Sequence, residues 1–389
     1  MKRTLGLIAA FAWCMPAFAQ QAYTVKAHVK GQGAYKLTLS YNSPSGRVSD
    51  SLQREGEDRF QVTGSVQEPV VAYLFNSHPA ARHEIVKGGM FMPAPALEFV
   101  LEAGQISISG NADNGYLATV NGGRLNAELG RLKQKENPLV QESWELRKRS
   151  AAIKRTDTAA VSAIRQQIAA VENKRLQVRK DYIAAHPASF ISMYLLSQLY
   201  ADYSPEAYEQ AFAKLAPAYK NSQYGKVVAG KIESAKATAL GQTAIGFSKK
   251  DINGQPFHLS SLKGKYVLLD FWGSWCGPCR QSHPHLKKVY EKYKAKGLEI
   301  VGISEEKMAD LAKSEAAWKK AVKDDGIDWV HVMNNYDKET FDLVQKYGVT
   351  GFPTKFLLDR EGRILYKLIG AGEEGDKALD EKLKAVFGE

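Results

Sequence analysis

Apolar and polar positions alternate in short runs between residues 22 and 110, and turn-forming residues separate the runs. Alternation with a period of two is typical of strands that bury one face. Six strands are expected, at residues 23–28, 35–41, 59–63, 70–75, 98–101 and 105–109. Short strands at regular spacing favour a small antiparallel sandwich or barrel. We therefore expect an all-β, sandwich-like domain over residues 20–115.

The pattern becomes helical from about residue 125 to residue 240. Apolar residues recur three, four or seven positions apart, which predicts a long helix with one buried stripe. They are Val161, Ile164, Ile168, Val171, Val178 and Tyr182. His186-Pro187 ends this helix, a second is expected at 188–200, and Ser204-Pro205 supplies the cap and first residue of a third. We assign residues 116–240 to an α-helical region, whose tyrosines are expected to pack between helices rather than to line a binding surface.

Strands and helices alternate in the last third of the chain. Strands are expected at 266–272, 298–304, 329–333, 355–359 and 364–369, the last two forming a hairpin, and helices at 279–296, 309–324, 340–347 and 376–387. This order predicts an α/β domain with a mixed central sheet flanked by helices, over residues 251–389. Residues 241–250 have the composition of a linker, so the chain is expected to be multidomain.

The first nineteen residues have the features of a signal peptide. Lys2 and Arg3 precede an apolar run at residues 5–15, and Ala17-Phe18-Ala19 provides a cleavage site. The run is too short to span a bilayer, and the residues before Cys14 lack the pattern required for lipid attachment. We therefore expect a mature protein that begins near Gln20 and is exported to the periplasm or cell envelope.

Basic residues are concentrated in the helical region. The formal charge of +11 falls to +9 without the leader, and residues 124–180 contain fourteen Lys and Arg against six Asp and Glu. A basic face can bind nucleic acid or anionic lipid. Because an exported protein rarely meets nucleic acid, we expect no nucleic-acid partner and interpret the charges as a solvated helical face.

Only two cysteines follow the leader, Cys276 and Cys279. A disulfide that closes so small a ring restricts the unfolded chain little, so the pair suits chemistry better than stability. An apolar strand delivers Cys276 to the start of a helix, where free N–H groups and the helix dipole favour a thiolate. We expect Cys276 to attack, Cys279 to resolve the mixed disulfide, and no cofactor beyond this redox-active disulfide.

Trp275-Cys276-Gly277-Pro278-Cys279 after an apolar strand resembles the thioredoxin active site. Residues 347–354 resemble the segment that carries the superfamily's cis-proline. The resemblance implies a proton-accepting role for Asp270, six residues before Cys276, and a cis bond before Pro353. It also implies substrate binding by Trp275, Gly277, Pro278, Phe352 and Pro353, with the backbone at Phe352 pairing with the substrate chain.

Residues 254–265 narrow the resemblance to the TlpA/ResA group of envelope thioredoxins, and the stretch between Cys279 and Pro353 is long enough for the extra helix and strand of that group. More weakly, the layout resembles exported proteins with an N-terminal β-domain of unknown function. Ser282 departs from the glutamate that several members carry, which weakens inferences about a cytochrome-specific pocket. Cys279 and His283 are four apart on a helix, but no second ligand pair has zinc spacing, so we expect no metal and interpret His283 and His285 as solvated or thiolate-tuning.

The function expected from these motifs is thiol–disulfide oxidoreduction. The resemblance implies a reductase of disulfides in exported proteins, with cytochrome c maturation or envelope redox homeostasis as its setting and a membrane electron donor of the thiol-transfer type as a partner. One alternative is a peroxiredoxin-like peroxide reductase, although the Pro-x-x-x-Thr-x-x-Cys signature is absent. Another is an envelope ligand-binding protein with a redox module, whose binding would survive in residues 20–240.

Overall fold

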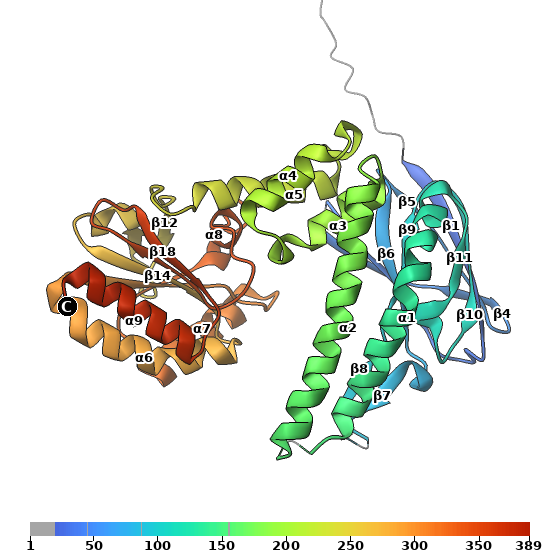
Figure 1. Cartoon of the computed structure of the whole chain (residues 1–389), viewed down its shortest axis with the longest axis horizontal. Coiled ribbons are helices and arrows are strands. Elements are labelled where there is room, and N and C mark those ends of the chain that lie inside the picture. Colours follow the sequence, from blue (N-terminus) through green and yellow to red (C-terminus); the bar gives the residue numbers. More distant parts are fainter. Residues whose placement is uncertain (1–19, 45, 87, 155) are drawn as a thin grey trace, which may run out of the picture. The chain divides into compact units, whose positions relative to one another are not determined.

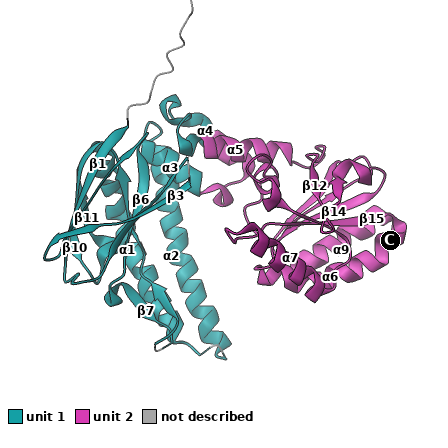
Figure 2. Cartoon of the chain, turned by 180° about the vertical axis from the view of Figure 1, so that it is seen from behind, with its two compact units in different colours: residues 1–198, 211–225 teal, residues 199–210, 226–389 magenta. Residues whose placement is uncertain are grey.

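The structure, a computed structural model, describes residues 20–389 apart from Ser45, Lys87 and Arg155. The predicted leader, including Cys14, lies outside the described residues. The chain forms two compact units: residues up to Gln198 with Ala211–Gly225, and Leu199–Gln210 with Lys226–Glu389 (Figure 2). Within the described part, no helix is long and apolar enough to cross a membrane. The predicted domain boundaries at 115, 240 and 250 stay predictions.

The first unit contains two sheets that share one core (Figure 1). One sheet has the order β11 (Thr119–Asn121), β10 (Gly104–Asn111), β1 (Gln21–Lys30), β5 (Arg59–Val66) and β4 (Gln53–Gly56). The other has the order β3 (Gly46–Ser51), β2 (Leu37–Ser43), β6 (Val70–Asn76) and β9 (Leu97–Leu101). A separate hairpin pairs β7 (Arg82–Glu84) with β8 (Phe91–Pro93). The predicted sandwich-like architecture is confirmed.

Alternation along the strands explains this sandwich. In β1, Tyr23, Val25, Ala27 and Val29 are buried in the shared core, while the residues between them face outward. The six predicted strands are all present. The expectation of a purely antiparallel domain is wrong, because β1 and β10 pair in parallel. The sequence pattern also missed β3, β4, β7, β8 and β11, which are short and mostly exposed and so carry little hydrophobic signal.

Five helices follow the sandwich: α1 (Arg124–Ala152), α2 (Thr158–Ala185), α3 (Phe190–Gln198), α4 (Pro205–Lys214) and α5 (Gln223–Ala237). The end of α2 before His186 and the start of α4 at Pro205 agree with the sequence, and Ser204 Oγ accepts a hydrogen bond from the Ala207 amide at 3.2 Å. The helices α4 and α5 contribute residues to both units.

Part of the basic cluster of the helical region is buried. The side chains of Lys133, Arg175 and Arg179 are 18%, 29% and 11% exposed, and all three contact the fully buried carboxylate of Glu136. Lys133 and Arg179 also pair with Glu98 on β9. The interpretation of a solvated helical face is therefore wrong for these three cations.

The second unit is built on a mixed sheet with the order β16 (Val330–Met333), β15 (Leu298–Ser304), β14 (Tyr266–Trp272), β17 (Thr354–Leu358) and β18 (Ile364–Ile369). The first three strands run parallel, and β17 and β18 form the predicted antiparallel hairpin. The helices are α6 (Gly277–Tyr293), α7 (Leu311–Asp325), α8 (Leu343–Lys346) and α9 (Glu373–Phe387). The predicted α/β architecture is confirmed, although α8 is shorter than the expected helix at 340–347.

Both faces of this sheet are covered, which is why its strands are almost wholly apolar. Leu268 and Trp272 of β14 lie in a core with α6, α7 and α9, whereas Val267, Leu269 and Phe271 lie in the opposite core. Alternation thus directs Asp270, between Leu268 and Trp272, toward the α6 side. The last three residues of the segment expected to be a linker form β12 (Ser248–Lys250), which pairs with β13 (Pro256–His258).

Candidate active site

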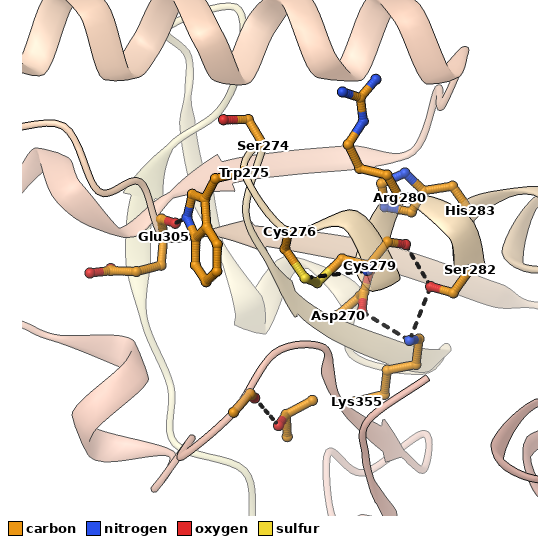
Figure 3. The surroundings of a disulfide bond; sticks show 12 residues. Asp270, Ser274, Trp275, Cys276, Cys279, Arg280, Ser282, His283, Glu305 and Lys355 are labelled. Atoms are coloured by element: carbon orange, nitrogen blue, oxygen red, sulfur yellow. Dashed lines mark hydrogen bonds and ion pairs between the residues drawn. A yellow bond between two sulfur atoms is a disulfide. The ribbon is translucent and has the colours of Figure 1, made fainter. Parts of the chain in front are cut away.

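Cys276 and Cys279 form a disulfide at the N-terminus of α6 (Figure 3). Cys276 is the N-cap residue of this helix, and its sulfur accepts a hydrogen bond from the Cys279 amide at 3.3 Å. Gly277 and Pro278 form the first turn, where proline's missing N–H costs nothing. Cys276 is 4% exposed and Cys279 is fully buried. One N–H group of the first helical turn therefore contacts the Cys276 sulfur, while Cys279 is shielded from solvent.

A buried ion pair lies beside the disulfide (Figure 3). Asp270 is 1% exposed, and its Oδ1 atom lies 3.5 Å from Lys355 Nζ without making a hydrogen bond. The Lys355 ammonium also donates to Ser282 Oγ at 3.5 Å, and the Ser282 hydroxyl donates to the Cys279 carbonyl at 2.8 Å. Polar contacts thus connect the carboxylate to the helical turn that carries Cys279.

Sequence reasoning missed Lys355. It lies in the wholly buried strand β17, directly before the apolar run Phe356–Leu358, and the register of β14 and β17 places it directly opposite Asp270. A charged residue in a strand that is buried on both faces was the available signal, because such a residue is rarely buried unless it is paired.

We expect Lys355→Met to make the reduction potential of the disulfide about 10 to 30 mV more negative. A nearby cation favours the thiolate and so stabilises the reduced form, and about 30 mV corresponds to one tenfold step in the equilibrium. The measurement is equilibration with dithiothreitol buffers followed by mass tagging of free thiols.

Lys265→Met is the matched control for this variant. Its side chain is 49% exposed and pairs with Glu299 rather than with Asp270, so the same change of charge occurs without removing the cation beside Asp270. We expect its potential to equal that of the unmodified protein. Equal shifts in the two variants would contradict a specific effect of Lys355.

An aromatic surface borders the cysteine pair. The Trp275 ring is 40% exposed and meets the Phe352 ring edge-to-face, with centroids 5.5 Å apart. Its Nε1 donates to the Glu305 carbonyl at 2.8 Å, and Lys307 Nζ lies 3.2 Å from the ring centroid. The Phe352–Pro353 bond is cis, as the resemblance implied. The structure therefore brings Trp275 and Phe352 together from loops that are distant in sequence.

A buried carboxylate holds the loop that precedes Cys276. Glu306 is 4% exposed and accepts hydrogen bonds from the Ser274 amide at 2.9 Å and the Ser274 hydroxyl at 2.5 Å. The Ser304 hydroxyl donates to the same carboxylate at 2.6 Å. These bonds anchor the active-site loop to the end of β15. Sequence reasoning missed Glu306, because the contact joins residues thirty-two positions apart.

His283 is buried rather than solvated. It is 1% exposed, its Nδ1 lies 2.7 Å from Asp325 Oδ2, and its ring packs against Trp272. Burial alone would raise the pKa of Asp325, but the hydrogen bonds from Arg280 and His283 outweigh it and lower that pKa. His285 contacts Asp376 and Asp380. In the described part of the chain, no group of three or more His, Cys, Asp or Glu is arranged to hold a metal ion.

Comparison with known proteins identifies the C-terminal module. Residues 239–383 match the Redoxin family. The thiol-disulfide oxidoreductase ResA of Bacillus thuringiensis (strain Al Hakam) is 33% identical over 147 residues, which cover 38% of this chain and 78% of that protein. The chain belongs to the ResA-like thiol-disulfide oxidoreductases of the thioredoxin superfamily. ResA of Bacillus subtilis (strain 168) is 33% identical over 151 residues, covering 39% of this oxidoreductase and 76% of the relative.

The first unit of this oxidoreductase has a separate match. Residues 23–129 match a domain of unknown function, DUF4369.

Among solved structures, a putative thiol:disulfide interchange protein DsbE from Chlorobium tepidum is 32% identical. The match covers 38% of this chain and 98% of that protein's chain, with a TM-score of 0.34. The Redoxin match, over residues 239–383, falls on the unit that carries Cys276 and Cys279.

Proposed function

We propose that this oxidoreductase is an exported reductase that transfers electrons to disulfides of other exported proteins in the periplasm or cell envelope. The observation that carries the proposal is the cysteine pair at the start of α6, with Cys276 capping the helix and Cys279 buried beside Asp270. The two basic residues and the apolar run within residues 1–19 have the pattern of a signal peptide, which supports export. Cytochrome c maturation is one process in which such substrates arise.

The proposed reaction is dithiol–disulfide exchange. The Cys276 thiolate attacks one sulfur of the substrate disulfide, forming a mixed disulfide, and the electron pair of the broken bond leaves on the second substrate sulfur, which takes up a proton. Cys279 then loses its proton to Asp270 and attacks Cys276 Sγ. The Cys276–Cys279 disulfide forms again, and the first substrate sulfur leaves as a thiolate. Two electrons have passed from the enzyme to the substrate.

Substrate recognition is proposed for the surface around the cysteine pair. Trp275 and Phe352 present aromatic faces beside Cys276, and the backbone at Phe352 is assigned to the substrate's extended chain. Gly277 carries no side chain at the first position of α6, so a substrate backbone can approach closely. A membrane partner of the thiol-transfer type is proposed to restore the dithiol by the reverse exchange.

The direction of electron flow is tested by the reduction potential of the Cys276–Cys279 couple. The mature protein is equilibrated with glutathione or dithiothreitol buffers, and free thiols are trapped with a mass tag. We expect a value nearer the thioredoxin figure of about −270 mV than the DsbA figure of about −120 mV. A value near the second figure would contradict a reductase and indicate a disulfide donor.

A further inference from the structure

A large groove lies within the first unit, whereas the cysteine pair belongs to the second unit. Its volume is about 970 Å³, and its walls come from the sheet that contains β2, β6 and β9 and from helices α1, α2 and α3. Val70, Ala72 and Leu74 of β6 face the sandwich core. Val71, Tyr73 and Phe75, which alternate with them, line the groove. A cavity of this size is within the range that small-molecule sites occupy.

Basic side chains predominate in the groove lining. Six of them line it: Arg47, Arg131, Lys133, Arg147, Arg175 and Arg179. Only two carboxylates, those of Glu98 and Glu172, line it as well. The excess of cations favours an anionic occupant, because a concave site concentrates the field of its charges.

The carboxylates satisfy only some of these cations: Lys133, Arg147 and Arg179 have close carboxylate partners. Arg175 Nε is buried without a hydrogen-bond partner, since its carboxylate contacts are long: Glu136 Oε1 lies 3.6 Å from Nε, and Glu172 Oε2 lies 3.7 Å from Nη1. A buried guanidinium N–H without an acceptor is costly, so such a donor indicates a missing partner. Arg47 and Arg131 form no ion pair with any described residue. Arginines suit recognition of carboxylate and phosphate, since the guanidinium can donate two parallel hydrogen bonds.

Aromatic rings complete the walls between the charged groups. Tyr73 and Tyr194 lie in the lining with their hydroxyls 2.7 Å apart, and Trp144 and Tyr224 also line the groove. These rings provide apolar surface together with hydroxyl and indole groups able to form hydrogen bonds. The lining therefore complements a molecule with an anionic group and an apolar or ring-containing body.

We propose that this groove is a binding site for a small anionic ligand that carries carboxylate or phosphate groups, separate from the disulfide chemistry of the second unit. Arg175 supplies the buried donor, and Arg47 and Arg131 supply unpaired charge nearer the solvent. The function of the sandwich and its helices is then ligand capture, and the basic cluster of residues 124–180 is in part the binding wall.

Calorimetric titration of the full mature chain tests this site with two probes, citrate for carboxylates and pyrophosphate for phosphates. We expect at least one probe to bind. Arg175→Gln should weaken that binding about tenfold, because the loss of a hydrogen bond to a charged group lowers an affinity by roughly that factor or more. Arg131→Gln, on an exposed side chain, is a second variant that should weaken binding without affecting folding. Disulfide reduction should be unchanged in both variants, which separates this proposal from the redox function.

The matched control is Arg149→Gln, on α1 but not in the groove lining. It removes the same charge from the same helix and should leave the affinity unchanged. Equal weakening by Arg149→Gln and Arg175→Gln would overturn the site in favour of diffuse attraction. Absence of binding by both probes would overturn the proposal.

Discussion

Cys276→Ser is expected to reduce the rate of insulin disulfide reduction to that of the reaction without enzyme. A serine hydroxyl is not ionised near neutral pH and cannot form the mixed disulfide, so no substrate enters the cycle. The measurement is insulin turbidity with dithiothreitol as the reductant. The cap of α6 survives the change, because serine is a favourable N-cap residue.

Cys279→Ser is the matched control, with the same substitution three residues along the helix. It retains the attacking thiol but loses the resolving one, so about one equivalent of mixed disulfide should accumulate. Mass spectrometry under non-reducing conditions measures this adduct. If Cys276→Ser accumulated the adduct and Cys279→Ser did not, the assigned roles of the two cysteines would be reversed.

Glu98→Gln is expected to destabilise the first unit by about 3 kcal/mol at neutral pH. Burial alone would raise the pKa of Glu98, but the charges of Lys133 and Arg179 outweigh it and lower the pKa from 4.5 to about 2. A lowering of that size corresponds to about 3 kcal/mol of stability. The expected fall in melting temperature is on the order of 10 °C for a unit of this size, and calorimetry measures it.

The pH dependence of this effect distinguishes it from a packing defect. A depressed carboxyl pKa stabilises the fold above pH 4.5, and the contribution is lost as the pH falls from 4.5 toward about 2. The difference between Glu98→Gln and the unmodified protein should shrink over that window. Glu145→Gln, whose side chain is 55% exposed, is the control and should change the stability by less than about 0.5 kcal/mol. A difference independent of pH would contradict the ion-pair explanation.

The sequence by itself determined the redox motif and the order of the elements. Cys276 and Cys279 are three residues apart, so their place at the start of a helix and their pairing follow from local geometry. The strand before them is visible in the sequence as a run of apolar residues. Hydrophobic periodicity likewise located the main strands and α2, since burial on one face leaves a local pattern. Short exposed strands such as β3 and β11 left no such pattern and were missed.

Only the tertiary structure decided which distant charges meet. Asp270 and Lys355 are eighty-five positions apart, and the register of β14 against β17 makes them neighbours. Glu98 meets Lys133 and Arg179 because a strand and two helices pack together. From the sequence alone, a charged residue is expected to be solvated, because most charged residues of folded proteins are exposed. Burial reverses that expectation here, because a buried ion requires a partner and long-range packing determines which residue that partner is.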